Sequence, residues 1–167
     1  MMKKILLLIT ILFTSINYAQ QEFKIDIADA LILKTVELSY ENYITEQTSF
    51  GGSVLYSFEK KTSDFRYNEQ FMLTPYVRHY FTTNENWNLF GEGFIGVSTG
   101  YKETEIDNAS NTFEKYSDGA LGIAVGSKYI SSGGLVIDVY GGLGRNLFSS
   151  NSPVIVPRVG VNVGWRF

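Results

Sequence analysis

The sequence predicts an all-β fold: an eight-stranded antiparallel up-and-down transmembrane β-barrel, preceded by a cleaved signal peptide. Three observations carry this prediction: the strict alternation of the C-terminal strand, the layout of the N-terminal segment, and the sorting of charged residues along the chain. The composition agrees, because 15% of the residues are aromatic, with 11 Tyr and 12 Phe, and only 3 are Pro. Aromatic-rich segments separated by glycine-containing turns are typical of β-strands.

The alternation is clearest at the C-terminus, where residues 157–167 read PRVGVNVGWRF. Large apolar side chains, ending in Trp165 and Phe167, alternate with a second set that includes Arg158 and Arg166. A period of two places the two sets on opposite faces of one strand. One face is therefore continuous and apolar, and the other mixes charged, amide and glycine residues.

The N-terminal segment has the layout of a secretory signal peptide. Lys3 and Lys4 precede residues 5–13, which are apolar apart from Thr10, and a more polar stretch continues to Ala19. The apolar run is too short to cross a bilayer as a helix, so we expect cleavage near Ala19; an uncut anchor is the alternative. This divides the chain into a signal peptide, 1–19, and one barrel domain, 20–167. The absence of cysteine leaves no acceptor for a lipoprotein anchor and no disulfide framework.

Eight alternating segments follow, joined by short and long connections in turn. The segments run near residues 23–31, 35–44, 50–58, 70–81, 87–101, 118–130, 135–147 and 155–167. The short connections are 45–49, 82–86 and 131–134, and the longer polar ones are 59–69, 102–117 and 148–154. Only the first connection, around 32–34, is short where a long one is expected. Short periplasmic turns and longer extracellular loops are typical of membrane barrels, and an even strand count returns both ends to the periplasmic side.

The phase of the last strand, extended to the other seven, sorts the charged residues onto the inner face. The inner set has five basic and five acidic members: Lys24, Asp26, Glu37, Glu41, Arg78, Glu92, Lys128, Asp138, Arg158 and Arg166. A Lys or Arg facing lipid near the bilayer centre costs about 2–4 kcal/mol, so this sorting favours a membrane barrel over a soluble one with an apolar interior. We expect the ten charges to pair as a lumenal charge network that fills the narrow interior.

The chain also resembles a known group. With the signal peptide, the strand FMLTPYVRHYF at 71–81 and the ending GVNVGWRF at 160–167, it is similar to the small eight-stranded outer-membrane β-barrel proteins of the OmpA/OmpX-like superfamily. The resemblance implies insertion in the outer membrane of a Gram-negative-type bacterium, among outer-membrane lipids and lipopolysaccharide. It also implies that Trp165 and Phe167 form the signal read by the barrel-assembly machinery during insertion. Unlike in full-length OmpA-type proteins, no peptidoglycan-binding domain is expected after the barrel.

The function favoured by the sequence is structural or surface interaction, with no catalytic, cofactor-binding or metal-binding residues. The G-x-G-x-x-G match at 91–96 lies inside a predicted strand with no helix after it, so it does not indicate a dinucleotide site. The acidic residues of the segment 102–117 lack the spacing of a calcium loop. A net charge of -3 with scattered signs gives no reason to expect nucleic acid. We expect the loop 102–117 to meet an extracellular partner, lipopolysaccharide or a surface.

Two alternatives stay open. A lipid A-modifying enzyme would need a histidine near the extracellular rim, whereas the single histidine, His79, is expected near the periplasmic rim and facing outward. A narrow channel for small solutes or ions would need an open lumen, whereas eight strands enclose a space that side chains fill.

Overall fold

The computed structural model describes residues 20–167 except 29, 32–33, 59–68, 84–85, 107–109 and 149–151, with the backbone alone for 102–113. The predicted signal peptide, 1–19, lies outside the described residues. The strands are β1 (Gln21–Asp26), β2 (Thr35–Tyr43), β3 (Thr48–Ser57), β4 (Glu69–Tyr80), β5 (Trp87–Ile106), β6 (Ser110–Ile130), β7 (Leu135–Asn146) and β8 (Ile155–Arg166). No helix in this described part has the length and apolar character needed to cross a bilayer.

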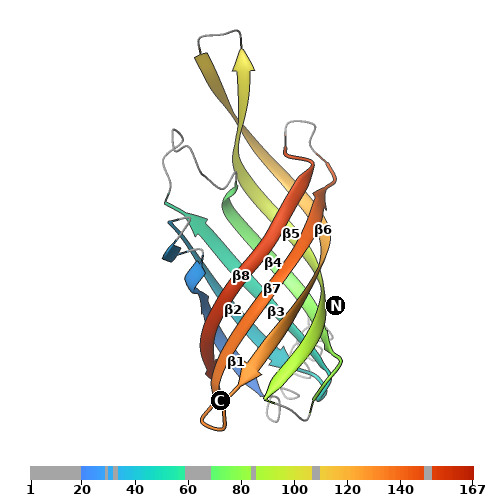
Figure 1. Cartoon of the computed structure of the whole chain (residues 1–167). Helices are drawn as coiled ribbons and strands as arrows, with labels where there is room; N and C mark the ends of the chain where they lie inside the picture. Colours follow the sequence, from blue (N-terminus) through green and yellow to red (C-terminus); the bar gives the residue numbers. More distant parts are fainter. Residues whose placement is uncertain are drawn as a thin grey trace, which may run out of the picture.

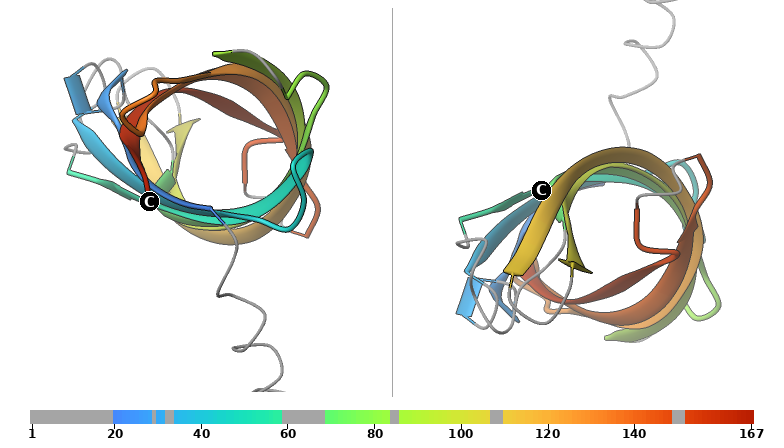
Figure 2. Two further views of the ribbon diagram at one scale, coloured as in Figure 1. Left: turned by 90° about the horizontal axis from the view of Figure 1, so that it is seen from below. Right: turned by 90° about the horizontal axis from the view of Figure 1, so that it is seen from above.

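The eight strands form a closed antiparallel barrel in sequence order (Figure 1). β8 pairs back to β1, with Glu22 opposite Arg166 and Ile25 opposite Val163, so the wall is a complete ring (Figure 2). Closure leaves no free sheet edge within the wall, which is what a sheet surrounded by lipid requires. The predicted eight-stranded up-and-down barrel is confirmed.

The two rims of the barrel differ in their connections. The lower rim holds the start of β1, the end of β8, the short turns 44–47 and 131–134, the end of β4 and the start of β5 (Figure 1). The upper rim holds the ends of β1, β3 and β7 and the starts of β2, β4 and β8, and above it the β5–β6 hairpin rises beyond the other strands (Figure 1). Because short turns are periplasmic in such barrels, the upper rim faces outward from the cell.

The first connection is longer than predicted. β1 ends at Asp26, not at Leu31, so the connection spans 27–34 and is as long as the one between β7 and β8, 147–154. A helical turn at residues 27–28 replaces the predicted strand end. Ala28, Ala30 and Leu31 favour helical over extended backbone, which the period of two does not reveal. The chain then enters β2 through Lys34, whose φ of 49° is left-handed.

The predicted loop 102–117 is wrong as well. β5 and β6 continue to Ile106 and from Ser110, and they pair above the barrel from Lys102 opposite Glu114 to Ile106 opposite Ser110. The segment is polar, and its lack of an apolar face suggested a loop. A ribbon with water on both faces needs no apolar face, because antiparallel pairing tolerates polar residues on any solvated side.

The barrel wall is inverted relative to that of a soluble protein. Its exterior exposes large apolar side chains such as Ile123, Val125 and Val159, which are 73%, 68% and 65% accessible. Its interior buries charged side chains instead, and Glu41 and Lys128 are 0% accessible. A barrel in water would bury its aliphatic side chains and expose its charges. The exterior is therefore a surface for lipid hydrocarbon.

Inward-facing glycines allow the strands and the lumenal side chains to pack closely. A Cβ added at Gly142 would lie 2.3 Å from the carbonyl oxygen of Ile123 and 2.4 Å from the Cβ of Ala124. The next residue, Gly141, faces outward, and a Cβ there would meet nothing within 4 Å. The two glycines therefore form a matched pair for substitution: a side chain at Gly142 would clash, whereas one at Gly141 would meet no other atom.

The substitution Gly142→Ala is expected to lower the free energy of unfolding by about 1–3 kcal/mol, because backbone must move to admit the methyl group. Gly141→Ala is expected to cause no loss. Urea titrations of the protein in lipid vesicles, followed by the fluorescence of Trp87 and Trp165, measure both. Equal losses at the two positions would show that the close approach at Gly142 is not needed.

Candidate functional site

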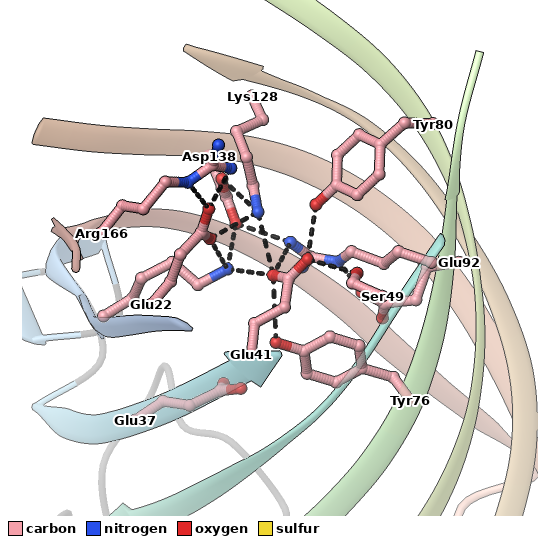
Figure 3. A network of polar contacts seen from close by, with 12 residues as sticks. Glu22, Glu37, Glu41, Ser49, Tyr76, Tyr80, Glu92, Lys128, Asp138 and Arg166 are labelled. Carbon is pink, nitrogen blue, oxygen red and sulfur yellow. Dashed lines mark hydrogen bonds and ion pairs between the residues drawn. The ribbon is translucent and has the colours of Figure 1, made fainter. Parts of the chain in front are cut away.

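The lumen contains a buried cluster of ion pairs centred on Glu41 of β2 (Figure 3). The Glu41 carboxylate accepts hydrogen bonds from Lys24 Nζ at 2.5 Å, Lys128 Nζ at 3.0 Å and Arg78 Nη1 at 3.1 Å. These cations come from β1, β6 and β4, so the cluster joins strands from different sides of the barrel. All four side chains are 0% or 1% accessible.

Hydroxyl groups complete the shell around Glu41. Ser49 Oγ and Tyr80 Oη both donate to Oε1 at 2.5 Å, and Tyr76 Oη lies 3.5 Å from Oε2. A buried carboxylate is costly unless its lone pairs are filled. Here both oxygens of Glu41 have several donors.

A second buried carboxylate, Asp138 of β7, shares the same three cations, with Lys128 Nζ the most distant at 3.8 Å from Oδ1. Its Oδ2 accepts from Lys24 Nζ at 2.7 Å and from Arg78 Nη1 at 2.6 Å. Glu41 and Asp138 thus lie on either side of Lys24 and Arg78. This alternation of signs compensates the repulsion within each like-charged pair.

The ion pairs continue toward the lower rim through Glu22. Its carboxylate accepts from Lys128 Nζ at 2.6 Å and from Arg166 at 2.9 Å (Nε) and 2.5 Å (Nη2). Arg166 also donates to Tyr43 Oη at 2.7 Å. Its side chain is 17% accessible, so Arg166 lies at the mouth of the lumen and not within it.

The ion pairs also continue toward the upper rim. Arg78 Nε donates to Glu92 at 2.6 Å, and Arg158 Nε donates to the other oxygen of Glu92 at 2.7 Å. Arg158 Nη1 then reaches Glu37 at 3.3 Å. A single chain of ion pairs therefore runs through the lumen from Arg166 to Glu37.

Aromatic rings fill the space between these charged side chains. The Arg78 guanidinium lies over Phe90 at 4.2 Å, and that of Arg158 lies over Tyr140 at 5.1 Å and Phe94 at 5.3 Å. Such cation–π contacts add about 0.5–2 kcal/mol each, more when water is excluded. The lumen is packed with alternating charges and rings.

Among the described residues, hollows lie at two heights beside this packing. A vestibule of about 290 Å³ opens at the lower rim and is lined in part by Tyr43, Tyr80 and Arg166. A void of about 10 Å³ lies higher, beside Glu37 and Arg158. The lower hollow could hold several water molecules, whereas the upper one is barely the size of one.

The structure brings nine of the ten predicted inward charges into the ion pairs described above. The tenth, Asp26, is fully buried on the same face, beside Gly160. Glu22 is absent from the predicted set, because the predicted first strand starts at Phe23. Glu22 has the same phase as Lys24 and Asp26, which was the signal that could have revealed it.

The other predicted residues lie on the exterior. Trp165 and Phe167 are 54% and 68% accessible at the lower rim, and their role as an assembly signal stays a prediction. His79 also faces outward near the lower rim, where its ring meets Phe81 edge-on at 5.6 Å and its Nδ1 lies 3.4 Å from Thr48.

A family model described as "Protein of unknown function (DUF3575)" matches residues 4–151. The chain belongs to this family. No curated protein matches it significantly. The match spans most of the barrel, from β1 to the end of β7.

Solved structures show the same fold. The N-terminal β-barrel domain of Pseudomonas aeruginosa OprF is similar with a TM-score of 0.58 and 11% identity, over 89% of this chain and 96% of that one. Neisserial surface protein A (NspA) is similar with a TM-score of 0.54 and 10% identity, over 89% of this chain and 94% of that one. These likenesses, together with the closed antiparallel wall and its apolar exterior, confirm the predicted fold class.

Proposed function

We propose that the protein is a non-catalytic barrel with a structural or surface-interaction role in the outer membrane, whose lumen is closed by its own side chains. The observation that supports this most directly is the chain of ion pairs from Arg166 to Glu37, which occupies the lumen along the barrel axis. Buried charges held this way stabilise one arrangement of the strands and leave little room for a substrate.

A closed lumen argues against the channel alternative. The purified protein, inserted in planar lipid bilayers, is expected to show no stable open conductance, because Arg78, Arg158 and the rings beside them fill the passage. Heat-modifiable gel mobility of the same preparation is the control that the barrel is folded. Long-lived, uniform conductance steps from the folded protein would contradict a closed lumen.

The enzyme alternative has little support from the position of His79. A lipid A-modifying enzyme would need an acid–base group near the outer leaflet, and His79 faces outward near the lower rim. The lumenal carboxylates Glu41, Glu92 and Asp138 are engaged by Lys and Arg, which keeps these three from acting as free bases.

The segment that reaches farthest from the membrane is the β5–β6 hairpin, and we assign the surface-interaction role to it. β4 pairs with β5 only as far as Gly100, and β7 pairs with β6 only from Ala120, so above the barrel the two strands pair with each other alone. Their outer edges are open to an extracellular partner or to lipopolysaccharide, in the way that exposed edges accept added strands.

The test is to shorten this hairpin. Replacing residues 102–113 with a tight turn is expected to leave heat-modifiable mobility unchanged and to abolish surface binding in whole-cell adhesion assays and cell cross-linking. The matched control exchanges the lower-rim turn 44–47, which faces the periplasm. Binding that survives the shorter hairpin unchanged would refute the assignment.

Two further partners belong to this proposal. Outer-membrane lipids would surround the apolar wall, and the barrel-assembly machinery would read Trp165 and Phe167 before insertion. Phe167 closes the lower rim through its backbone, donating to Gln21 O at 2.9 Å and accepting from Gln21 N at 3.1 Å, while its ring stays outside.

A further inference from the structure

The lipid-facing wall is not smooth, because an apolar groove of about 820 Å³ crosses it from β3 to β7. Pro75 on β4 and Gly93 on β5 form part of its lining and project little from the wall. A Cβ added at Gly93 would meet nothing within 4 Å, so the floor of the groove is open to whatever surrounds the barrel.

Strand register explains why the groove lies there. Gly93 is opposite Val77 on one side and Ile123 on the other, and Ile123 is opposite Leu143. Gly93, which has no side chain, thus lies in one row with branched apolar residues of β4, β6 and β7. The walls are built by Phe50, Val77, Ile95, Leu121, Ile123 and Leu143. The volume is within the range of roughly 300–1,000 Å³ found for small-molecule sites.

One end of the groove is positively charged. Arg145, next to last in β7 and therefore close to the upper rim, lines the groove and is exposed on the outside of the wall. Below Lys115, which lies opposite Tyr101 at the base of the hairpin, it is the only charged residue that faces outward in the described barrel wall. None of the ion pairs within the described residues includes it.

A lone arginine facing lipid needs an explanation. The cost is about 2–4 kcal/mol near the bilayer centre and falls to about 0–1 kcal/mol at the interface, which fits a position near the upper rim. There it meets the headgroup region of the outer leaflet. A guanidinium group binds phosphate through two parallel hydrogen bonds, so a phosphorylated headgroup is its natural counter-ion.

We propose that this groove is a lipid-binding site, which takes an acyl chain of a phosphorylated lipid of the outer leaflet while Arg145 binds the phosphate. A second copy of the barrel fits less well, because no acidic side chain faces outward in the described wall to pair with Arg145. The inference rests on the outer-membrane location of the barrel and is independent of the role proposed for the β5–β6 hairpin.

The experiment is native mass spectrometry of the purified full barrel, released from detergent after addition of bis-phosphorylated lipid A or of phosphatidylcholine. Gly93→Leu fills the groove. The control Gly141→Leu makes the same change on the lipid face outside the groove lining, and a Cβ meets nothing within 4 Å at either glycine. Arg145→Gln removes the charge and leaves the groove unchanged, so it tests the proposal even if Gly93→Leu does not fold.

The wild-type protein is expected to retain lipid A, and Gly141→Leu is expected to match it. Gly93→Leu should retain about fivefold less, through lost packing of the acyl chain. Arg145→Gln should retain about tenfold less lipid A, the equivalent of one charge-assisted hydrogen bond, with phosphatidylcholine retention unchanged.

Three results would overturn the proposal. Equal retention by Gly93→Leu and Gly141→Leu would show that the groove holds no lipid. Unchanged lipid A retention by Arg145→Gln would show that Arg145 does not bind the phosphate. A dimer in the wild-type spectrum that Gly93→Leu abolishes would identify a second copy of the chain as the occupant. A loss of surface binding on shortening the hairpin bears on none of these outcomes.

Discussion

Replacing Glu41 with Gln is expected to lower the free energy of unfolding by about 3–5 kcal/mol, the usual cost of removing one partner from a buried ion pair. Glu41 accepts hydrogen bonds from Lys24, Lys128 and Arg78, all of them buried. The amide has nearly the same shape, so packing is conserved and the change isolates the charge. The three cations would then share the remaining carboxylates nearby, which are Asp138, Glu22 and, for Arg78, Glu92.

The measurement is urea unfolding of the protein in lipid vesicles, with Glu46→Gln as the matched control. Glu46 lies exposed in the lower-rim turn between β2 and β3, so its loss should change the free energy of unfolding by well under about 1 kcal/mol. If Glu41→Gln were as harmless as Glu46→Gln, the ion pairs of the lumen would not hold the barrel together.

Replacing Val125 with Arg is expected to cost about 2–4 kcal/mol of unfolding free energy in lipid. Val125 is 68% accessible and lies in the part of β6 that pairs with both β5 and β7. In water, an exposed Val could be exchanged for Arg with little effect. In a bilayer, the same position places a guanidinium among acyl chains.

Val154 provides the control, because it is 65% accessible but lies in the upper-rim connection just before β8. Val154→Arg is expected to cost about 0–1 kcal/mol, the value for an interfacial position. Urea titrations of both variants in the same vesicles compare them directly. Equal costs would mean that the exterior at Val125 does not face lipid hydrocarbon.

Much of the wall could be predicted from the sequence because a strand has a side-chain period of two. Once the C-terminal strand assigned its apolar face to the outside, every other alternating segment could be phased in the same way. Nine of the predicted inward charges are buried in the structure, and Arg166 is half-buried at the mouth. The same rule places Glu22 inside once the first strand is extended by one residue, and it places Arg145, within the predicted segment 135–147, on the outside.

Other features depend on information that periodicity does not carry. The β5–β6 ribbon above the barrel has water on both faces, so its strands lack an apolar face to mark them. The contacts of Glu41 with residues of four other strands depend on how far each strand is staggered relative to the next. The groove beside Gly93 depends likewise on the register that sets Ile123 opposite it.

The central claim is that this chain is a closed barrel with lipid outside and charges within. Gel mobility of the outer-membrane fraction, extracted in detergent and loaded with or without heating, tests it most directly. A closed barrel resists unfolding by detergent at room temperature, so the unheated protein should migrate faster than the heated one. Equal mobility of the two samples, with the protein recovered in the soluble periplasmic fraction, would contradict the account.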